Sequence, residues 1–185
     1  MNAFIVECIK ANKEIYNYIN QELTAEDFQY HGSLGEGGDK SLNMDLKAES
    51  IFIKYLSSFG NIYSEEIGYI KTNNKNQKNN TIIIDPLDGS NNFASSHPYY
   101  GTSVALECDG KVIIGIVCNL INGSIIIRDE NNILNRYDLD ANLLKSENFE
   151  YSQSKIGIFE RSYAYPNLCL KLHDNKLKFN SYTLI

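Results

Sequence analysis

Hydrophobic residues recur at helical spacing in two segments within the first sixty positions. The first segment, residues 4–23, spaces its apolar positions for one face of a helix: Phe4, Cys8, Ile15, Ile19 and Leu23. The second segment, residues 44–59, does the same with Ala48, Ile51, Phe52, Tyr55, Leu56 and Phe59. Gly60 is placed to end this second helix. The sequence therefore predicts two amphipathic helices, and the Gly-rich stretch 31–41 between them is expected to be a loop.

The middle of the chain changes to a strand pattern. Residues 61–66 predict a short strand that ends in Glu65 and Glu66, and a solvated loop at 71–80 follows. Strands are then predicted at 102–108, 111–120 and 124–128, with a fourth around 133–137. An Asp-Gly pair at 109–110 and an Asn-Gly pair at 122–123 are typical of two-residue hairpin turns. These features predict an antiparallel meander preceded by helices.

A polar linker at about 140–154 separates this region from a second strand, helix and strand pattern. The expected elements are a strand at 155–160, a short helix at 166–174 and a strand at 176–185. The fold class is therefore α+β, or a layered α/β architecture with an antiparallel central sheet. We expect an N-terminal lobe at 1–150 and the beginning of a second α/β lobe at 151–185, which we expect to be incomplete because the chain stops inside an apolar run.

Composition and charge narrow the function classes. The formal net charge is −6, which argues against direct binding of nucleic acid, and no apolar run is long enough to cross a membrane. The four cysteines have neither disulfide-framework nor metal-ligand spacing, and no signal peptide is recognised. Reduced thiols and a cytoplasmic location are expected.

The candidate chemistry begins at residues 82–90, "IIIDPLDGS", where an apolar strand runs into acid. Pro86 cannot donate to a sheet ladder, so the strand is expected to end near Asp85, and Gly89 permits a tight turn. Asp85 and Asp88 would then lie close together and repel unless a cation or a proton lies between them. Hard cations such as Mg²⁺ take such oxygen ligands, but an Asx-type turn is the common alternative for this pattern in isolation.

Further acidic residues accompany this motif. "SEE" at 64–66 also ends a predicted strand, and "GDKSLNMD" at 38–45 brings Asp45 after the Gly-rich loop. With "IIIDPLDGSNNF" at 82–93, these pieces resemble, in order and spacing, the superfamily of inositol monophosphatase and fructose-1,6-bisphosphatase. The resemblance implies a layered αβαβα sugar-phosphatase fold.

The resemblance also implies roles for individual residues. Glu65 and Asp85, with the main-chain carbonyl of Leu87, would ligate a first Mg²⁺, and Asp85 with Asp88 would hold a second. Asp45 and Ser90 would orient the attacking water and help to deprotonate it. The amides of Gly89 and Ser90, next to Asp88, would receive the substrate phosphate. Two flanking residues are not expected to act as ligands: Glu66 and Asp39.

The activity implied by this resemblance is Mg²⁺-dependent hydrolysis of a phosphomonoester by water, with two or three ions in the intact site and inhibition by Li⁺. The substrate would be a small phosphorylated metabolite: an inositol phosphate, fructose 1,6-bisphosphate, 3′-phosphoadenosine phosphate or NADP. A homodimer is also expected.

One part of the pattern is absent from the sequence. The family's second metal takes an aspartate from a late Trp-Asp motif, but this chain contains no tryptophan. Its late aspartates Asp129, Asp138 and Asp174 are expected to be solvated residues of turns and loops. The alternative function is therefore a catalytically impaired member of the family that binds Mg²⁺ or a protein partner.

Overall fold

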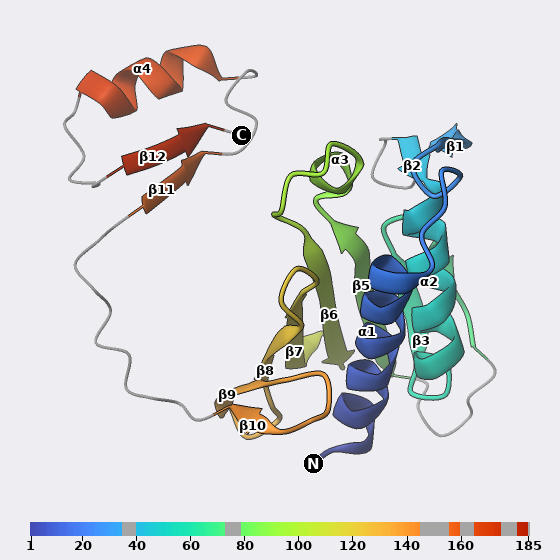
Figure 1. Cartoon of the computed structure of the whole chain (residues 1–185). Helices are drawn as coiled ribbons and strands as arrows, with labels where there is room; N and C mark the ends of the chain where they lie inside the picture. The colour runs from blue at the N-terminus through green and yellow to red at the C-terminus, as the bar shows by residue number, and fades with distance from the viewer. Residues whose placement is uncertain (35–39, 73–78, 145–155, 160–164, 175–180, 185) are drawn as a thin grey trace. The chain divides into compact units, whose positions relative to one another are not determined.

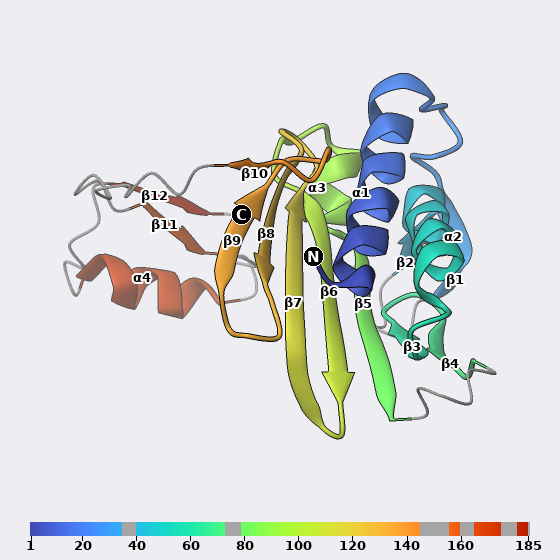
Figure 2. The ribbon, with the colours of Figure 1, turned by 90° about the horizontal axis from the view of Figure 1, so that it is seen from below.

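Two helices, α1 and α2, form the helical layer of the structure, which is a computed structural model (Figure 1). The described residues are 1–34, 40–72, 79–144, 156–159, 165–174 and 181–184, and they divide into two compact units, Met1–Lys145 and Ser146–Ile185. In the first unit, α1 spans Ala3–Gln21 and α2 spans Asn43–Leu56, as the apolar spacing predicts. The helices lie side by side on one face of the sheet (Figure 2). None of the described helices is long and apolar enough to cross a membrane.

The sheet of the first unit contains eight strands in the order β10-β9-β8-β7-β6-β5-β3-β4. Their bounds are β3 Asn61–Ser64, β4 Gly68–Ile70, β5 Asn80–Asp88, β6 Gly101–Cys108, β7 Lys111–Asn119, β8 Ser124–Arg128, β9 Leu134–Tyr137 and β10 Leu143–Leu144. All neighbouring strands pair antiparallel except β3 and β5, which pair parallel. The predicted meander of β6, β7, β8 and β9 is confirmed. Gly110 and Gly123 occupy the hairpin turns with positive φ of 78° and 69°.

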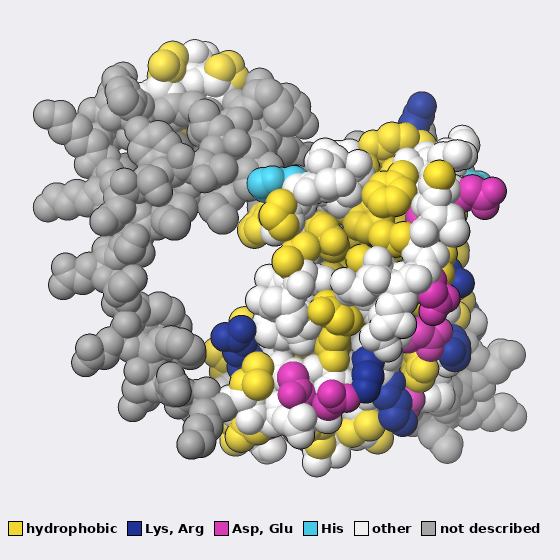
Figure 3. Space-filling model, viewed as in Figure 1, with side chains coloured by type: hydrophobic (Ala, Val, Ile, Leu, Met, Phe, Trp, Pro, Cys, Tyr) yellow, Lys and Arg dark blue, Asp and Glu magenta, His cyan; other side chains and the backbone are white. Residues whose placement is uncertain are grey.

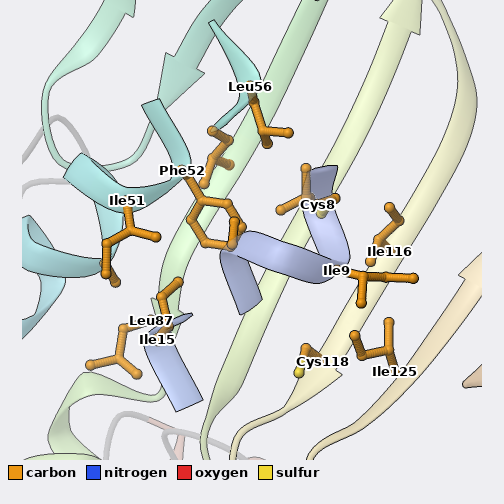
Figure 4. Packing of buried hydrophobic residues seen from close by; sticks show 14 of the residues in the cluster. Cys8, Ile9, Ile15, Ile51, Phe52, Leu56, Leu87, Ile116, Cys118 and Ile125 are labelled. Atoms are coloured by element: carbon orange, nitrogen blue, oxygen red, sulfur yellow. The ribbon is translucent and has the colours of Figure 1, made fainter. Parts of the chain in front are cut away.

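The core lies between the helical layer and one face of this sheet. Side chains alternate across a strand, so Ile82 and Ile84 of β5 point into the core whereas Ile83 is 36% exposed on the opposite face. Figure 4 shows the core from close by, where residues of α1 and α2 pack against residues of the strands. Phe52 belongs to α2, whereas Ile116 belongs to β7 and Ile125 to β8. Burial of these apolar side chains is the main stabilising contribution to the unit.

Several local predictions need correction. The region 31–41 is not wholly a loop, because β1 (Tyr30–Leu34) and β2 (Lys40–Leu42) pair antiparallel; residues 35–39 lie outside the described part. The second helix ends at Leu56 rather than at Phe59. Beyond Leu56 the chain makes a tighter turn, in which the Phe59 amide donates a hydrogen bond to the Leu56 carbonyl three residues earlier. Strand β4 was missed, and β10 lies within the predicted linker.

The strand before the acid cluster also runs further than predicted. β5 continues past Pro86 to Asp88, and its pairing with β6 becomes irregular between Asp85 and Asp88. A proline lacks the amide that the ladder needs, so it is accommodated at a bulge instead of ending the strand. The bulge leaves Asp85 and Asp88 at the end of β5, from which α3 (Ser90–Ala94) begins.

The second unit is a strand, a helix and a strand, in the predicted order. β11 (Ile156–Phe159) and β12 (Ser181–Leu184) pair parallel, and α4 (Pro166–Asp174) lies between them in sequence. Asp174 therefore ends a helix and is not a loop residue. Asp129 and Asp138 are turn residues as predicted, because each accepts hydrogen bonds from backbone amides two and four positions further on.

Candidate metal centre

Four structural elements converge at the carboxyl end of β5: the turn between β3 and β4, the bulge of β5, the start of α3 and the start of α2. The parallel register places Ser64 beside Ile84, so Glu65 follows at the level of Asp85. The Glu65 amide donates a hydrogen bond to the Ile84 carbonyl at 3.1 Å. The backbone therefore brings Glu65 and Asp85 together, although they are far apart in sequence.

The environment of Asp85 is strongly unfavourable for its negative charge. Its pKa is raised to about 7, first by burial, then by repulsion from the Glu65 and Asp88 carboxylates and by a hydrogen bond with Glu65. A hydrogen bond from the Leu87 amide acts in the opposite direction and lowers this pKa. Crowded carboxylates of this kind hold a proton, or they hold a cation that removes the repulsion.

Asp45 and Ser90 form the second part of the centre. The Ser90 hydroxyl lies 2.9 Å from Asp45 Oδ1 and 3.0 Å from the Leu87 carbonyl oxygen, so its single proton can serve either acceptor. Asp45 Oδ2 accepts the Leu42 amide at 2.6 Å at the start of α2. Burial raises the pKa of Asp45 to about 6, while the hydrogen bonds from Leu42 and Ser90 lower it and the nearby Glu66 and Glu65 raise it. Asp45 is therefore a buried carboxylate that can accept a proton near neutral pH.

Gly89 links the bulge to α3 in a conformation that only glycine adopts without strain. Its φ is 94° and its ψ is 37°, in the left-handed region. A Cβ at this position would lie 2.8 Å from the Tyr99 carbonyl oxygen.

Just beyond Gly89, the buried ring of Phe93 stacks on Phe28 and meets Tyr100 edge to face. Figure 3 shows hydrophobic side chains gathered around α3 and the β1–β2 hairpin at this end of the unit.

Glu66, which is not expected to be a ligand, has its own hydrogen-bond partner on β2. Its carboxylate accepts a hydrogen bond from the buried Ser41 hydroxyl of β2. Burial raises the pKa of Glu66, the bond from Ser41 lowers it and Glu65 raises it. Glu66 thus ties β2 to the β3–β4 turn. Asp39 lies outside the described residues.

The donor set of this centre suits Mg²⁺. Within the described ranges, no three side chains of His, Cys, Asp or Glu are grouped closely enough to enclose a metal by themselves. A Mg²⁺ site in a protein needs less than that, because the ion keeps several waters and is bound through one or two carboxylates and substrate phosphate. Asp85 with Glu65, and the Leu87 carbonyl at the bulge, provide such a set.

A pocket opens beside these carboxylates on the sheet face opposite the helices. Its volume is about 290 Å³, and it is lined by Tyr63, Glu65, Ile83, Ile84, Asp85, Ser103 and Ala105. Asp85 and Glu65 supply its acidic edge, whereas the remainder is mostly apolar. The carboxylates are therefore accessible to a small molecule from this side.

Sequence reasoning missed two residues of this region, Ser41 and Glu49. Glu49 lies on the apolar stripe of α2 and is fully buried, at 0% exposed. The signal was present, because a glutamate four residues after Asp45 shares its helix face with the buried Phe52. A charged residue within an apolar stripe indicates a specific partner.

The protein is an α+β protein, because two helices cover one face of a mostly antiparallel sheet. Acidic residues at the ends of β3 and β5 form its candidate metal centre. Comparison with known structures shows the fold of the inositol monophosphatases. SuhB from Bartonella henselae superposes with a TM-score of 0.74 at 19% identity, over 99% of this chain and 70% of that protein. The predicted fold class is thus confirmed.

The family follows from the sequence comparison. Residues 4–161 match the model of the inositol monophosphatase family, so this chain belongs to that family. It is 37% identical over 113 residues to a fructose-1,6-bisphosphatase/inositol-1-monophosphatase of Methanocaldococcus jannaschii, across 60% of this chain and 43% of the relative. It is 29% identical over 147 residues to the Nus factor SuhB of Buchnera aphidicola, across 72% of this chain and 54% of the relative. The chain thus spans about half the length of these curated relatives or less.

Proposed function

We propose that this chain carries the catalytic metal centre of a Mg²⁺-dependent phosphomonoesterase. The observation that supports this most directly is the burial of Asp85 beside Glu65 and Asp88, because burial first, and then repulsion from these two carboxylates, raises the pKa of Asp85 to about 7. Because the carboxylates repel one another when no cation is bound, a cation that binds between them is stabilised.

The geometry of the centre supports a division of labour among its residues. Asp85 and Glu65, with the Leu87 carbonyl, would hold Mg²⁺, and Asp85 with Asp88 would contribute to a second ion. A bound Mg²⁺ would lower the pKa of the attacking water and neutralise the phosphate. The Ser90 hydroxyl donates to Asp45 Oδ1, so Ser90 would take up the proton of that water as its own proton passes to Asp45.

The proton then has a nearby acceptor in Asp45, whose pKa of about 6 is close to the range useful for a general base. The amides of Gly89 and Ser90, at the start of α3, face the substrate side of the bulge in this proposal and would bind a phosphate oxygen. The substrate class is a small phosphorylated sugar or inositol, in keeping with the name of the Methanocaldococcus jannaschii relative, a fructose-1,6-bisphosphatase/inositol-1-monophosphatase.

Release of phosphate from a panel of inositol phosphate, fructose 1,6-bisphosphate, 3′-phosphoadenosine phosphate and NADP would test this function. We expect Mg²⁺-dependent turnover that Li⁺ inhibits and that D88N reduces by about 100-fold or more. Equal turnover by the wild type and D88N would contradict the proposal.

A second candidate function is a Mg²⁺-binding or protein-interaction module without turnover. The Nus factor SuhB of Buchnera aphidicola, which aligns with 72% of this chain, favours it. Absence of turnover on the whole panel, together with Mg²⁺ binding that D85N abolishes, would select this function.

A further inference from the structure

Glu49 is a buried carboxylate to which the proposed mechanism gives no role. It lies on α2, one helical turn after Asp45, and is 0% exposed. A carboxylate in such a place destabilises the folded chain unless it makes specific hydrogen bonds. Glu49 is therefore expected to have a definite task.

The described residues that contact the Glu49 carboxylate lie at the two ends of the turn between β3 and β4. The Ile67 amide donates to Glu49 Oε1 at 3.1 Å. The Ser64 hydroxyl lies beside the carboxylate and lowers its pKa, whereas burial raises this pKa most and Glu66 raises it further. Ser64 Oγ and Glu49 Oε2 are both fully buried, and among the described residues neither atom has a hydrogen-bond partner at normal geometry, so the two polar atoms lie next to each other away from water.

These contacts hold both ends of the segment that presents the acidic residues. Ser64 is the last residue of β3, and Ile67 is the last residue before β4, so Glu65 and Glu66 lie between the two points that Glu49 touches. The turn has two further attachments, from the Glu65 amide to Ile84 and from Glu66 to Ser41. Glu49 is the attachment that comes from the helical layer.

We propose that Glu49 is a positioning residue that holds the β3–β4 turn in place from α2, and so sets where the Glu65 carboxylate lies relative to Asp85. Only the expected effect of Glu49 on Mg²⁺ affinity rests on the proposed function; its effect on the β3–β4 turn does not. Residues that orient metal ligands typically change metal affinity by about 10- to 100-fold when they are replaced.

The test compares E49L with E49Q. Leucine has nearly the volume of glutamate, but it removes the acceptor of the Ile67 amide and the carboxylate that lies beside the Ser64 hydroxyl. Glutamine keeps an oxygen for the Ile67 amide and an NH₂ group for Ser64 Oγ, without the charge. L56A serves as the control, because Leu56 is a fully buried residue of the same helix that lies two turns beyond Glu49.

Two quantities are measured on the whole chain: deuterium exchange of the amides at 65–70 without metal, and Mg²⁺ affinity by calorimetry. We expect E49L to speed exchange in the turn and weaken Mg²⁺ binding, each by about tenfold. E49Q should stay within about twofold of the wild type, and L56A should leave the Mg²⁺ affinity unchanged. If E49L does not fold, E49D provides the same test, because its shorter side chain withdraws the carboxylate from the Ile67 amide.

Wild-type exchange in E49L, or faster exchange with unchanged Mg²⁺ affinity, overturns the inference. An equal loss of Mg²⁺ affinity in L56A also overturns it, because the effect would then be one of general stability. If the wild type binds no Mg²⁺ while E49L still exchanges faster, the proposed function fails and the role of Glu49 in the turn is supported.

Discussion

At the scale of single residues, Asp85 shows how a site can be assembled at the expense of stability. Its pKa is raised from 3.8 to about 7, so the folded chain binds a proton more tightly than the unfolded chain does. Between about pH 4 and pH 7 the folded state therefore holds more protons, and its stability falls as the pH rises through this window. A bound cation would reverse this effect by removing the repulsion.

We expect D85N to raise the free energy of unfolding of the metal-free chain by about 1–3 kcal/mol at about pH 8, because the repulsion from Glu65 and Asp88 disappears. At about pH 4 the gain should vanish, and Mg²⁺ should stabilise the wild type but not D85N. Urea unfolding at both pH values, with and without Mg²⁺, measures these differences. A D85N variant that is less stable than the wild type at about pH 8 would contradict the argument.

The conformation of Gly89 leads to a second prediction at this scale. G89A introduces a Cβ that meets the Tyr99 carbonyl oxygen, in addition to the strain of its positive φ. G110A is the matched control, because Gly110 also has a positive φ but nothing lies within 4 Å of a Cβ there. We expect G89A to cost at least about 1 kcal/mol more than G110A in thermal unfolding. Equal costs would show that the contact with Tyr99 relaxes freely.

At the scale of elements, β5 combines a structural face and a functional end. Ile82 and Ile84 fill the core, Ile83 faces the pocket, and Asp85 follows where the bulge begins. Because side chains alternate along the strand, the buried face of β5 anchors the acidic end that follows it. Truncating a side chain on the buried face of β5 should therefore lower the free energy of unfolding much more than truncating one on the other face.

We expect I82A to lower the free energy of unfolding by about 2–5 kcal/mol, because it opens a cavity in the core. I83A should cost less than about 1.5 kcal/mol, because Ile83 is already 36% exposed and packs on one side only. Urea unfolding of both variants measures the difference. Similar losses would mean that the outer face of β5 is packed as tightly as the core.

At the scale of the whole molecule, the outer face of the sheet is unusually apolar. Tyr63, Ile83, Val117 and Ile126 lie on the face opposite α1 and α2, and they are between 36% and 53% exposed. Exposed apolar faces of this kind favour association. An apolar outer face of this kind favours the homodimer that the family resemblance leads us to expect.

We expect V117K to weaken self-association by about tenfold or more, because it places a charge within the apolar face. Q21K, which adds the same charge at an exposed position at the end of α1, should have no such effect. Sedimentation velocity over a range of concentrations distinguishes the two variants. A V117K variant that associates as the wild type does would move the contact surface away from this face.

The sequence by itself determined the two helices of the first unit, the meander of β6 to β9, and the strand, helix and strand of the second unit. The helical spacing of Phe4 and Cys8, and the Asp-Gly and Asn-Gly turns, depend on interactions between neighbours in the chain. Local rules sufficed there because the relevant atoms are only a few residues apart. The motif at 82–90 was predicted only in part, because Gly89 makes the expected turn but β5 continues through a bulge to Asp88 instead of ending near Asp85.

Only the tertiary structure decided which residues meet. The parallel pairing of β3 with β5 brings Glu65 to Asp85, and the packing of α2 brings Asp45 within 2.9 Å of Ser90. The same packing buries Glu49 against the β3–β4 turn, which its place in the sequence only hinted at. These contacts join residues 18 to 45 positions apart, so they depend on how the hydrophobic faces of separate elements pack, and no local pattern specifies that.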